Sequence, residues 1–458
     1  MSDRWVLRGA RVVTPEGELP RAIHVEGELI ARVLKYDDVP AGMRLVEAGD
    51  LVVLPGLVDT HVHINEPGRT DWEGFATATA AAAAGGVTTL IEMPLNAIPP
   101  TTTVAGLRAK LAAAAGQLAV DVGFWGGVVP GNAGELEHLW AAGVFGFKAF
   151  LCPSGVEEFG HVGEGDLRAA LPVLARLGAP LLAHAELPEV LDHALEMECA
   201  VCFEERAYRC YLCTRPPEAE HRAIAMLLDV ARESGARVHV VHLASAQALP
   251  ALAEARRAGV PVSVETCPHY LTFAADDVPD GATEFKCAPP IREREHREGL
   301  WEGLRAGTID LVATDHSPCP PAMKRREAGE FLPAWGGIAS LQLGLAATWT
   351  GASARGFDLT DIARWMGAAP ARLAGLDGRK GAIAPGADAD LIVFDPDEEF
   401  VVDPARLLHR HPVTPYAGRR LRGVVERTYL RGAIVYADER VVDDERGRVL
   451  TRSAATTR

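Results

Sequence analysis

The chain has 458 residues, of which 24% are charged, and a formal net charge of −16 at pH 7. This composition is typical of a soluble globular protein and excludes a disordered one, and the negative charge argues against nucleic acid or an anionic membrane as a partner. No apolar run approaches the roughly 18 residues of a membrane span, and the N-terminal MSDRWVLRGA lacks the apolar core of a secretion signal, so we expect a cytoplasmic protein.

Both ends of the chain are predicted to form short β-strands. Residues 1–54 contain strand-like runs separated by turns, such as WVLRGARVVT before PEGELP, and residues 376–458 show the same pattern in LIVFDP and TYLRGAIVYADERVV. Closely spaced turn signals of this kind indicate a small β-sheet unit. We expect the two ends to be halves of one β-sandwich domain, with the rest of the chain inserted between them.

Residues 55–375 alternate strand-like runs with amphipathic stretches rich in Ala, Leu and Arg. This alternation predicts a parallel sheet with right-handed crossovers, and eight such units favour an α/β fold with a (β/α)8 TIM-type barrel over an open sheet. Polar residues repeatedly end the apolar runs, which is where such a barrel keeps its active site. The eight runs are LVVLPGLVDTH, TTLIEMP, AVDVGFWGGV, GVFGFKAFL, APLLAHAE, RVHVVHLAS, PVSVETCPHYL and IDLVATDHS.

The first of these runs ends in two histidines, in the sequence VDTHVHINEP. Because side chains alternate along a strand, His61 and His63 share one face. Two imidazoles side by side at the end of a buried strand are costly unless something binds them, and a metal ion is a common partner. From these two residues alone, a metal site and a pair of hydrogen-bonded histidines are both open, since two ligands do not complete a site.

Four further ionisable residues lie on later strand-like runs: Lys148, His184, His242 and Asp315. A single strand-end histidine is more often structural, but six such positions meeting at one barrel mouth favour a metal centre. His239 lies on the same run as His242 and is expected to face the other way, so we choose His242, the later of the two.

Longer segments of the chain resemble the cyclic amidohydrolases of the amidohydrolase superfamily, and most closely the allantoinase family within them. The resemblance covers nearly the whole chain. Its segments are PGLVDTHVHINEPGRTDWEGF, GGVTTLIEMPLNAIPPTT, GFKAFL, HAELPE, VVHLASAQAL, ETCPHYLTF, FKCAPPIRE and LVATDHSPCPP.

The resemblance implies a distorted barrel, a flanking β-sandwich and two divalent metal ions per chain, expected to be zinc. It places His61, His63 and Asp315 on one ion, and His184 and His242 on the other. It also implies that Lys148 bridges the ions after reaction with CO₂, as N6-carboxylysine.

The implied ligands make chemical sense. A lysine ammonium has no lone pair for a metal, whereas its carbamate is an oxygen anion. A hydroxide shared by ions about 3.5–4 Å apart is a ready nucleophile near neutral pH. Asp315 would take the proton of this hydroxide and pass it to the departing ring nitrogen, which is a poor leaving group without it.

The substrate expected from the resemblance is allantoin, opened at its hydantoin ring to allantoate in purine catabolism. Dihydroorotase-like relatives have an arginine at the position of Asn65, which would bind a carboxylate, and hydantoinase-like relatives have a tyrosine at the position of Pro153. Asn65, Cys287 and Ser317 are candidate substrate contacts, although each is about as well explained as a loop residue that shapes the mouth.

The chain contains eight cysteines, four of them in two CxxC pairs. Cys199 with Cys202 and Cys210 with Cys213 could form a structural tetrathiolate metal site, although the seven-residue spacer is short for one. A disulfide or redox pair and unbonded thiols are the alternatives. The other four cysteines are expected to line the barrel.

Two rival functions remain at this stage. A dihydropyrimidinase or hydantoinase is the nearest alternative, and a non-catalytic scaffold of the same fold is the more distant one. Every ligand position is filled, which disfavours the scaffold. The resemblance further implies a small-molecule substrate and a homo-oligomer, expected to be a tetramer.

Overall fold

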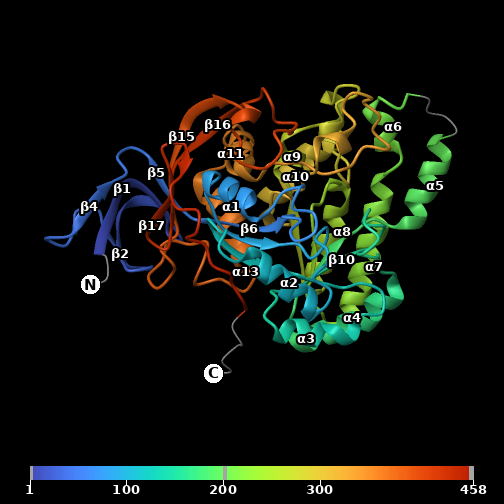
Figure 1. The fold of residues 1–458 in the computed structure, drawn as a ribbon, viewed down its shortest axis with the longest axis horizontal. Coiled ribbons are helices and arrows are strands. Elements are labelled where there is room, and N and C mark those ends of the chain that lie inside the picture. The colour runs from blue at the N-terminus through green and yellow to red at the C-terminus, as the bar shows by residue number, and fades with distance from the viewer. Residues whose placement is uncertain (1–3, 200–203, 453–458) are drawn as a thin grey trace.

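The computed structural model describes residues 4–199 and 204–452. Strands from both ends of the chain form one nine-stranded sheet, in which β5 pairs with β1 on one side and with β15 on the other. Figure 1 shows these blue and red strands together at one end of the molecule. The terminal strands are β1 (Arg4–Thr14), β2 (Gly17–Glu26), β3 (Leu29–Lys35), β4 (Arg44–Glu47), β5 (Val52–Pro55), β15 (Leu391–Val401), β16 (Arg420–Leu430), β17 (Ala433–Ala437) and β18 (Arg440–Val441).

The middle of the described chain forms the barrel, with parallel pairing throughout. β8 and β9 are two parts of one strand interrupted at Trp125, and together they join the two sheets of the barrel. The barrel strands are β6 (Leu57–Val62), β7 (Val87–Glu92), β8 (Asp121–Phe124), β9 (Gly126–Gly127), β10 (Phe147–Phe150), β11 (Leu181–His184), β12 (Val238–Val240), β13 (Val262–Thr266) and β14 (Leu311–Val312).

The barrel closes between its last and first strands. Val62 forms a parallel bridge with His316, and the His63 amide donates to the His316 carbonyl at 2.9 Å. The predicted fold class is therefore confirmed. One detail differs: the run LVVLPGLVDTH is two strands, because Val52–Pro55 joins the terminal sheet and the barrel strand begins at Leu57. The proposed domain boundaries after residues 54 and 375 stay predictions.

Helices surround the barrel, and α7 shows how the sequence sets their position. Pro217 opens α7 in the first turn, and Gly235 ends it in a left-handed conformation with φ 69°. Its buried face repeats every three to four residues, as the period of a helix requires: Ala219, Glu220, Ala223, Ile224, Leu227, Leu228, Val230 and Ala231. This packing leads the chain directly into β12 and so to His242.

The helices as the structure has them are α1 (Phe75–Ala84), α2 (Val104–Ala114), α3 (Leu136–Ala141), α4 (Glu164–Leu177), α5 (Pro188–Cys199), α6 (Tyr208–Cys213), α7 (Pro217–Ser234), α8 (Leu249–Arg257), α9 (Pro268–Thr272), α10 (Arg294–Arg305), α11 (Gly344–Ser353), α12 (Leu359–Ala363) and α13 (Ala369–Leu373).

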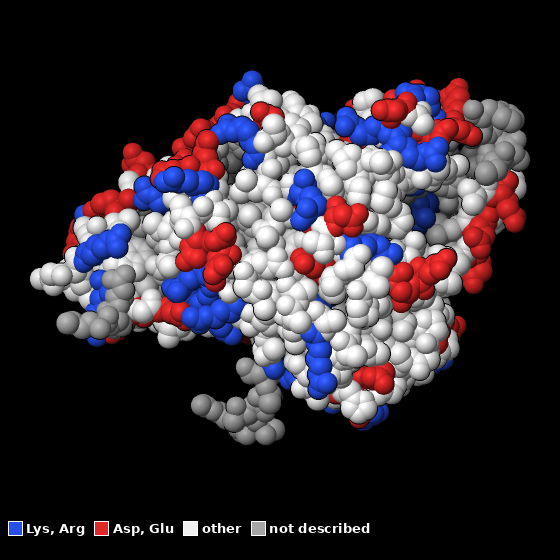
Figure 2. Space-filling view, in the orientation of Figure 1, with Lys and Arg blue, Asp and Glu red and all other residues white. Residues whose placement is uncertain are grey.

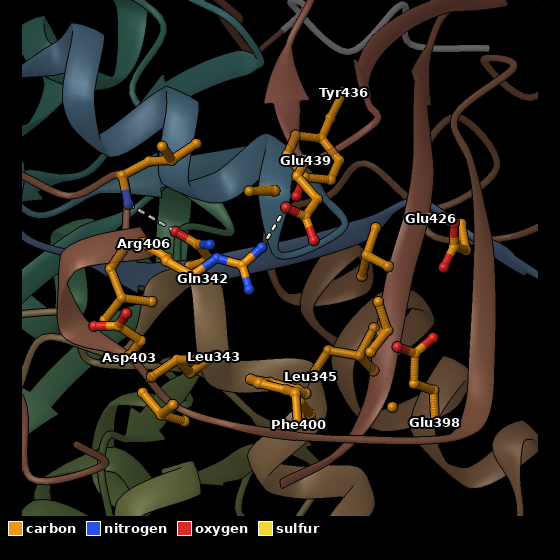
Figure 3. Close-up of a pocket in the computed structure, with 18 of the residues that line it drawn as sticks. Gln342, Leu343, Leu345, Glu398, Phe400, Asp403, Arg406, Glu426, Tyr436 and Glu439 are labelled. Atoms are coloured by element: carbon orange, nitrogen blue, oxygen red, sulfur yellow. Dashed lines mark hydrogen bonds and ion pairs between the residues drawn. The ribbon is translucent and has the colours of Figure 1, made fainter. Parts of the chain in front are cut away.

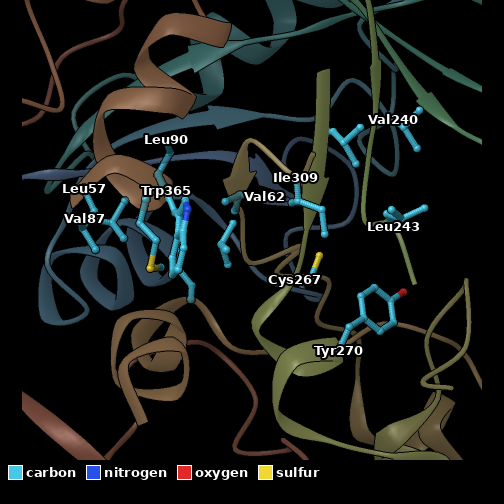
Figure 4. Packing of buried hydrophobic residues seen from close by; sticks show 14 of the residues in the cluster. Leu57, Val62, Val87, Leu90, Val240, Leu243, Cys267, Tyr270, Ile309 and Trp365 are labelled. Carbon is cyan, nitrogen blue, oxygen red and sulfur yellow. The ribbon is translucent and has the colours of Figure 1, made fainter. Parts of the chain in front are cut away.

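The core extends from the barrel to its covering helices. Trp365 lies in a short π-helix, Arg364–Ala368, and is buried beside Leu57 and Val87 (Figure 4). On the other side of the same view lie Leu243, which directly follows His242 in the chain, and Tyr270 of α9, and both belong to the same buried cluster. Close packing of this kind holds the strand ends in fixed positions.

Buried charges join the terminal sheet to the barrel. Lys380 donates to Asp121, at the start of β8, and to Asp390, just before β15, each at 2.7 Å. Arg431 also bonds to Asp121. Removing one partner would leave a buried charge unpaired, which is strongly destabilising.

Charges on the surface contribute much less. Figure 2 shows acidic and basic side chains mixed over the face that it displays, and many form exposed pairs such as Arg4 with Glu26. Such pairs add little to stability, so among the charged residues it is the buried network that contributes most to holding the sheet against the barrel.

Candidate metal centre

The structure brings the six predicted ligand residues to one place at the C-terminal edge of the barrel strands. Three of them, His61, Lys148 and His184, lie on strands, and the other three follow strands. None of the side chains exposes more than a small fraction of its surface. The residues are His61, His63, Lys148, His184, His242 and Asp315.

Three of the six residues form a compact group. Nε2 of His61 lies 3.3 Å from Oδ1 of Asp315, and Nε2 of His63 lies 3.5 Å from the same oxygen. One ligand atom from each residue lies within 4.8 Å of the other two, which is close enough to hold one metal ion. Burial lowers the pKa of His63 to about 4, so its imidazole is neutral and able to ligate.

Two more histidines form the second half of the centre. Nδ1 of His184 lies 2.9 Å from Nε2 of His242. The ring centroid of His242 is 5.3 Å from that of His61, so the two halves are adjacent. Burial, together with His184 and Lys148, holds the pKa of His242 well below its usual value, which keeps this ring neutral as well.

Lys148 lies among these residues without a partner. Its Nζ is fully buried and makes no hydrogen bond within the described part of the chain. An unpaired buried ammonium is costly, and burial accordingly lowers the pKa of Lys148 to about 8. The neutral amine, the form that reacts with CO₂, is therefore more populated in Lys148 than in an exposed lysine.

Two glutamates orient the histidines from behind, and the sequence interpretation did not include them. His61 bonds through Nδ1 to Glu265, which leaves Nε2 facing Asp315. His184 bonds through Nε2 to Glu186 at 2.7 Å, which leaves Nδ1 facing His242. Carboxylates placed this way fix the ring orientation of metal-binding histidines. The sequence pattern could have identified both glutamates, because Glu265 is near the end of β13 and Glu186 follows β11 by two residues, the positions where the predicted ligands also lie.

Glu265 also contacts the backbone of His242, a residue of the second half of the centre. It accepts from His239 at 3.0 Å and from the His242 amide at 3.2 Å. Although burial alone would raise the pKa of Glu265, His61 and His239 lower it to about 2. His239 therefore contacts the same carboxylate as His61, and its place outside the ligand group stays a prediction.

Replacing Glu265 with glutamine is expected to weaken metal binding by about 10- to 100-fold, the usual effect of losing such a partner. The glutamine side chain has one oxygen acceptor and no charge, so it cannot accept hydrogen bonds from both His61 and His239. The His61 ring therefore loses its fixed orientation. Metal titration against a competing chelator measures this change. Glu302→Gln, on the exposed face of α10, serves as the control, and an unchanged affinity in Glu265→Gln would contradict the assigned role.

Strained backbone surrounds the same site. Four residues at the strand ends have left-handed φ angles without being glycine: Asn65 (66°), Asn96 (66°), His242 (39°) and Asp315 (46°). Asp59 holds the neighbouring backbone by accepting from the His61 amide at 3.0 Å and the Thr314 amide at 3.2 Å. Strain of this kind persists only where the surroundings enforce it and is concentrated at functional sites.

A cavity of about 280 Å³ opens above the centre. Cys287 and Ser317 line it, and Ser317 Oγ donates to Asp315 Oδ1 at 2.7 Å. Their role as substrate contacts stays a prediction. Arg215, Lys286 and Trp335 also line the cavity and were not predicted. They lie on loops whose sequence gave no strand-end pattern.

Asn65, the third predicted substrate contact, lies behind the cavity, and its role in substrate binding stays a prediction. It is fully buried and is absent from the cavity lining. Its side-chain NH₂ lies 3.4 Å from the Pro318 carbonyl and so contacts the loop after Asp315, while its Oδ1 has no partner among the described residues.

The cysteine pairs are only partly described. Cys202 and the side chain of Cys199 lie outside the described residues, so the prediction for them stays a prediction. Cys210 and Cys213 both lie on α6, one turn apart, and Cys210 is disulfide-bonded. A disulfide sulfur is not a thiolate ligand, so a tetrathiolate site would require this bond to be reduced. The remaining cysteines, Cys152, Cys267, Cys287 and Cys319, are buried free thiols.

A larger cavity, of about 510 Å³, lies between the terminal sheet and the barrel helices (Figure 3). Phe400, Leu345 and Tyr436 line it together with an ion pair between Arg406 and Glu439. The metal-type groups found within the described residues lie elsewhere, at the barrel mouth. Size alone therefore does not identify the active site of this chain.

Among the described residues, no helix has both the length and the apolar character needed to span a membrane.

Comparison with protein families agrees with the geometry. A model of the amidohydrolase family matches residues 52–435, which covers the barrel and the terminal-sheet strands β5, β15, β16 and part of β17.

Individual relatives are similar over almost the whole chain. An allantoinase of Streptomyces avermitilis is 54% identical, covering 99% of this chain and 100% of its own. An allantoinase of Arabidopsis thaliana is 43% identical, covering 97% and 90%. The solved L-hydantoinase (dihydropyrimidinase) of Arthrobacter aurescens superposes with a TM-score of 0.93 at 30% identity, covering 99% and 100%.

Proposed function

This chain belongs to the amidohydrolase family and, within it, to the allantoinases, and we propose how its residues carry out the reaction of that group. The reaction is hydrolysis of the cyclic amide of allantoin, which opens the hydantoin ring to give allantoate. The observation that carries the proposal is the convergence of four histidines, an aspartate and an unpartnered lysine beneath one cavity.

The residues present fit two divalent metal ions. His61, His63 and Asp315 would hold one ion and His184 with His242 the other, since their free nitrogen and oxygen atoms already face each other. Lys148, as a carbamate, would bridge the two, and its buried nitrogen without a partner supports this role. Imidazole and carboxylate ligands suit zinc. When bound, the ions would polarise the ring carbonyl and make water a better nucleophile.

Asp315 is proposed to move the proton. Burial would raise the pKa of its carboxyl, but His61, His63 and His242 hold that pKa well below its usual range, so Asp315 is ionised at neutral pH. It can then take a proton from the attacking water and give it to the departing ring nitrogen. Ser317 Oγ orients this carboxylate through its hydrogen bond.

Cys287 is not a rival nucleophile. Burial raises the pKa of its thiol to about 12, so it is protonated at neutral pH. Because the thiolate is the reactive form, Cys287 acts as a neutral wall of the cavity. This favours attack by water over covalent catalysis.

Allantoin is expected to be turned over much faster than dihydroorotate. Position 65 carries asparagine, and the nearby arginines are already paired, Arg69 with Glu158 and Arg215 with Glu186. Among the described residues, no free guanidinium is therefore available to a carboxylate held directly on the substrate ring. Lys286 also lines the cavity without a described carboxylate partner, but it is only partly buried, so fast turnover of dihydroorotate would point to that lysine.

Initial rates on allantoin, hydantoin, dihydrouracil and dihydroorotate test this proposal. Faster turnover of hydantoin and dihydrouracil than of allantoin would favour the hydantoinase alternative, which the likeness to the Arthrobacter enzyme keeps in view. Efficient turnover of dihydroorotate would overturn the assignment. A chain that binds metal and hydrolyses none of the four would support the scaffold alternative. The tetramer implied by the resemblance also stays a prediction, which the mass in solution tests.

A further inference from the structure

Lys286 is a cation on the cavity wall that the proposed reaction does not use. It lies beside Cys287, and its Nζ donates to the carbonyls of Leu332 and Ala334, both at 2.7 Å. Its Nζ also lies 4.8 Å from the centre of the Tyr211 ring. An ammonium has three N–H donors, so these two carbonyls leave one donor for a further acceptor.

The charge of Lys286 is not neutralised by the described parts of the protein. Arg215, also on the cavity wall, pairs with Glu186, whereas Lys286 forms no ion pair with any described carboxylate. Burial, together with the positive charges of Arg215 and Lys324, lowers the pKa of Lys286 to about 7. A polar acceptor in the cavity would therefore stabilise the ammonium form.

The position of Lys286 indicates which part of a substrate it would contact. The metal-ligand side chains below are almost fully buried, while Lys286 is only partly buried. The scissile ring amide must lie against the buried residues, so Lys286 faces whatever projects from the ring toward the mouth. In allantoin that group is the ureido arm, whose carbonyl is a strong hydrogen-bond acceptor.

We infer that Lys286 determines substrate specificity by donating its third N–H to the ureido carbonyl of allantoin. This inference rests on the proposed function. The interaction selects for the arm and leaves binding of the bare ring unaffected. A site built to hydrogen-bond a substrate group discriminates against ligands that lack it, because its buried polar group is then unpaired.

The experiment compares Lys286→Met with the parent enzyme, both loaded with metal. Methionine keeps an unbranched chain but has no donor. We expect kcat/KM for allantoin to fall by about 10- to 100-fold, the range for a hydrogen bond to a charged group, mainly through KM. The Ki of hydantoin, which has the ring without the arm, should stay within about twofold, and the metal content should not change.

Lys324→Met is the matched control. Lys324 also donates to backbone carbonyls of the same loop, those of Trp335 and Gly337, but it does not line the cavity. Any loss in that variant should affect allantoin and hydantoin equally. The same equal loss in Lys286→Met, or unchanged kinetics with allantoin, would overturn the inference.

The outcome can be separated from that of the proposed function. If the parent does not hydrolyse allantoin, the proposed function fails, and calorimetric binding of allantoin to the parent and to Lys286→Met then decides the role of Lys286. Weaker binding of allantoin alone supports the inference. Equal binding to the two proteins, or no binding to the parent, overturns it.

Discussion

Replacing Lys148 with alanine is expected to abolish both turnover and the binding of two metal ions. Lys148 is fully buried between the two halves of the centre, and its nitrogen has no hydrogen-bond partner among the described residues. Without the proposed carbamate, two dications would share four histidine ligands, with Asp315 as the single anionic ligand in the group. Metal content per chain and the rate with allantoin measure the effect.

Lys148→Met separates the chemistry from the packing. Methionine fills similar space, so this variant should unfold near the parent's Tm while still lacking both metals and activity. Short carboxylic acids added with metal should partly restore the rate in Lys148→Ala, because they can occupy the position of the missing carbamate. Full activity with two metals per chain in either variant would refute the bridging role.

Replacing Asp315 with asparagine is expected to lower kcat by at least about 100-fold, within the range for general acid–base catalysis. The amide occupies the same space and can keep a contact with Ser317, but it cannot take a proton from water. Since Asp315 also contacts His61 and His63, metal content must be measured in parallel, and the rate expressed per metal-loaded chain. KM should change less than kcat.

Asp310→Asn is the control for this variant. Asp310 lies at the opposite end of the same strand, where it pairs with Arg256 and accepts from the Val264 amide. Its replacement should affect stability more than kcat, because the N-terminal end of a barrel strand supports the fold and the C-terminal end carries the chemistry. A near-normal kcat in metal-loaded Asp315→Asn would remove Asp315 from the mechanism.

The sequence predicted the parts of the site that depend on local pattern. His61 and His63 share a face because strand side chains alternate, and His184 and Asp315 follow apolar runs that a barrel places at one edge. Lys148 lies on a strand-like run of the same series, and the family resemblance indicates its role. The paired β-rich ends of the chain likewise predicted one terminal sheet, because their turns recur at short intervals.

Other parts of the site were decided only by the tertiary structure. Glu265 reaches His61 across 204 positions of sequence, and Lys286 faces the cavity because a distant loop, through Leu332 and Ala334, holds its ammonium there. Asn65 follows the predicted strand but turns behind the cavity, in a left-handed conformation that its residue type permits without requiring. Strand alternation is a property of the local backbone and can be read along the chain. The direction of a loop side chain depends on contacts that form only when distant segments pack together.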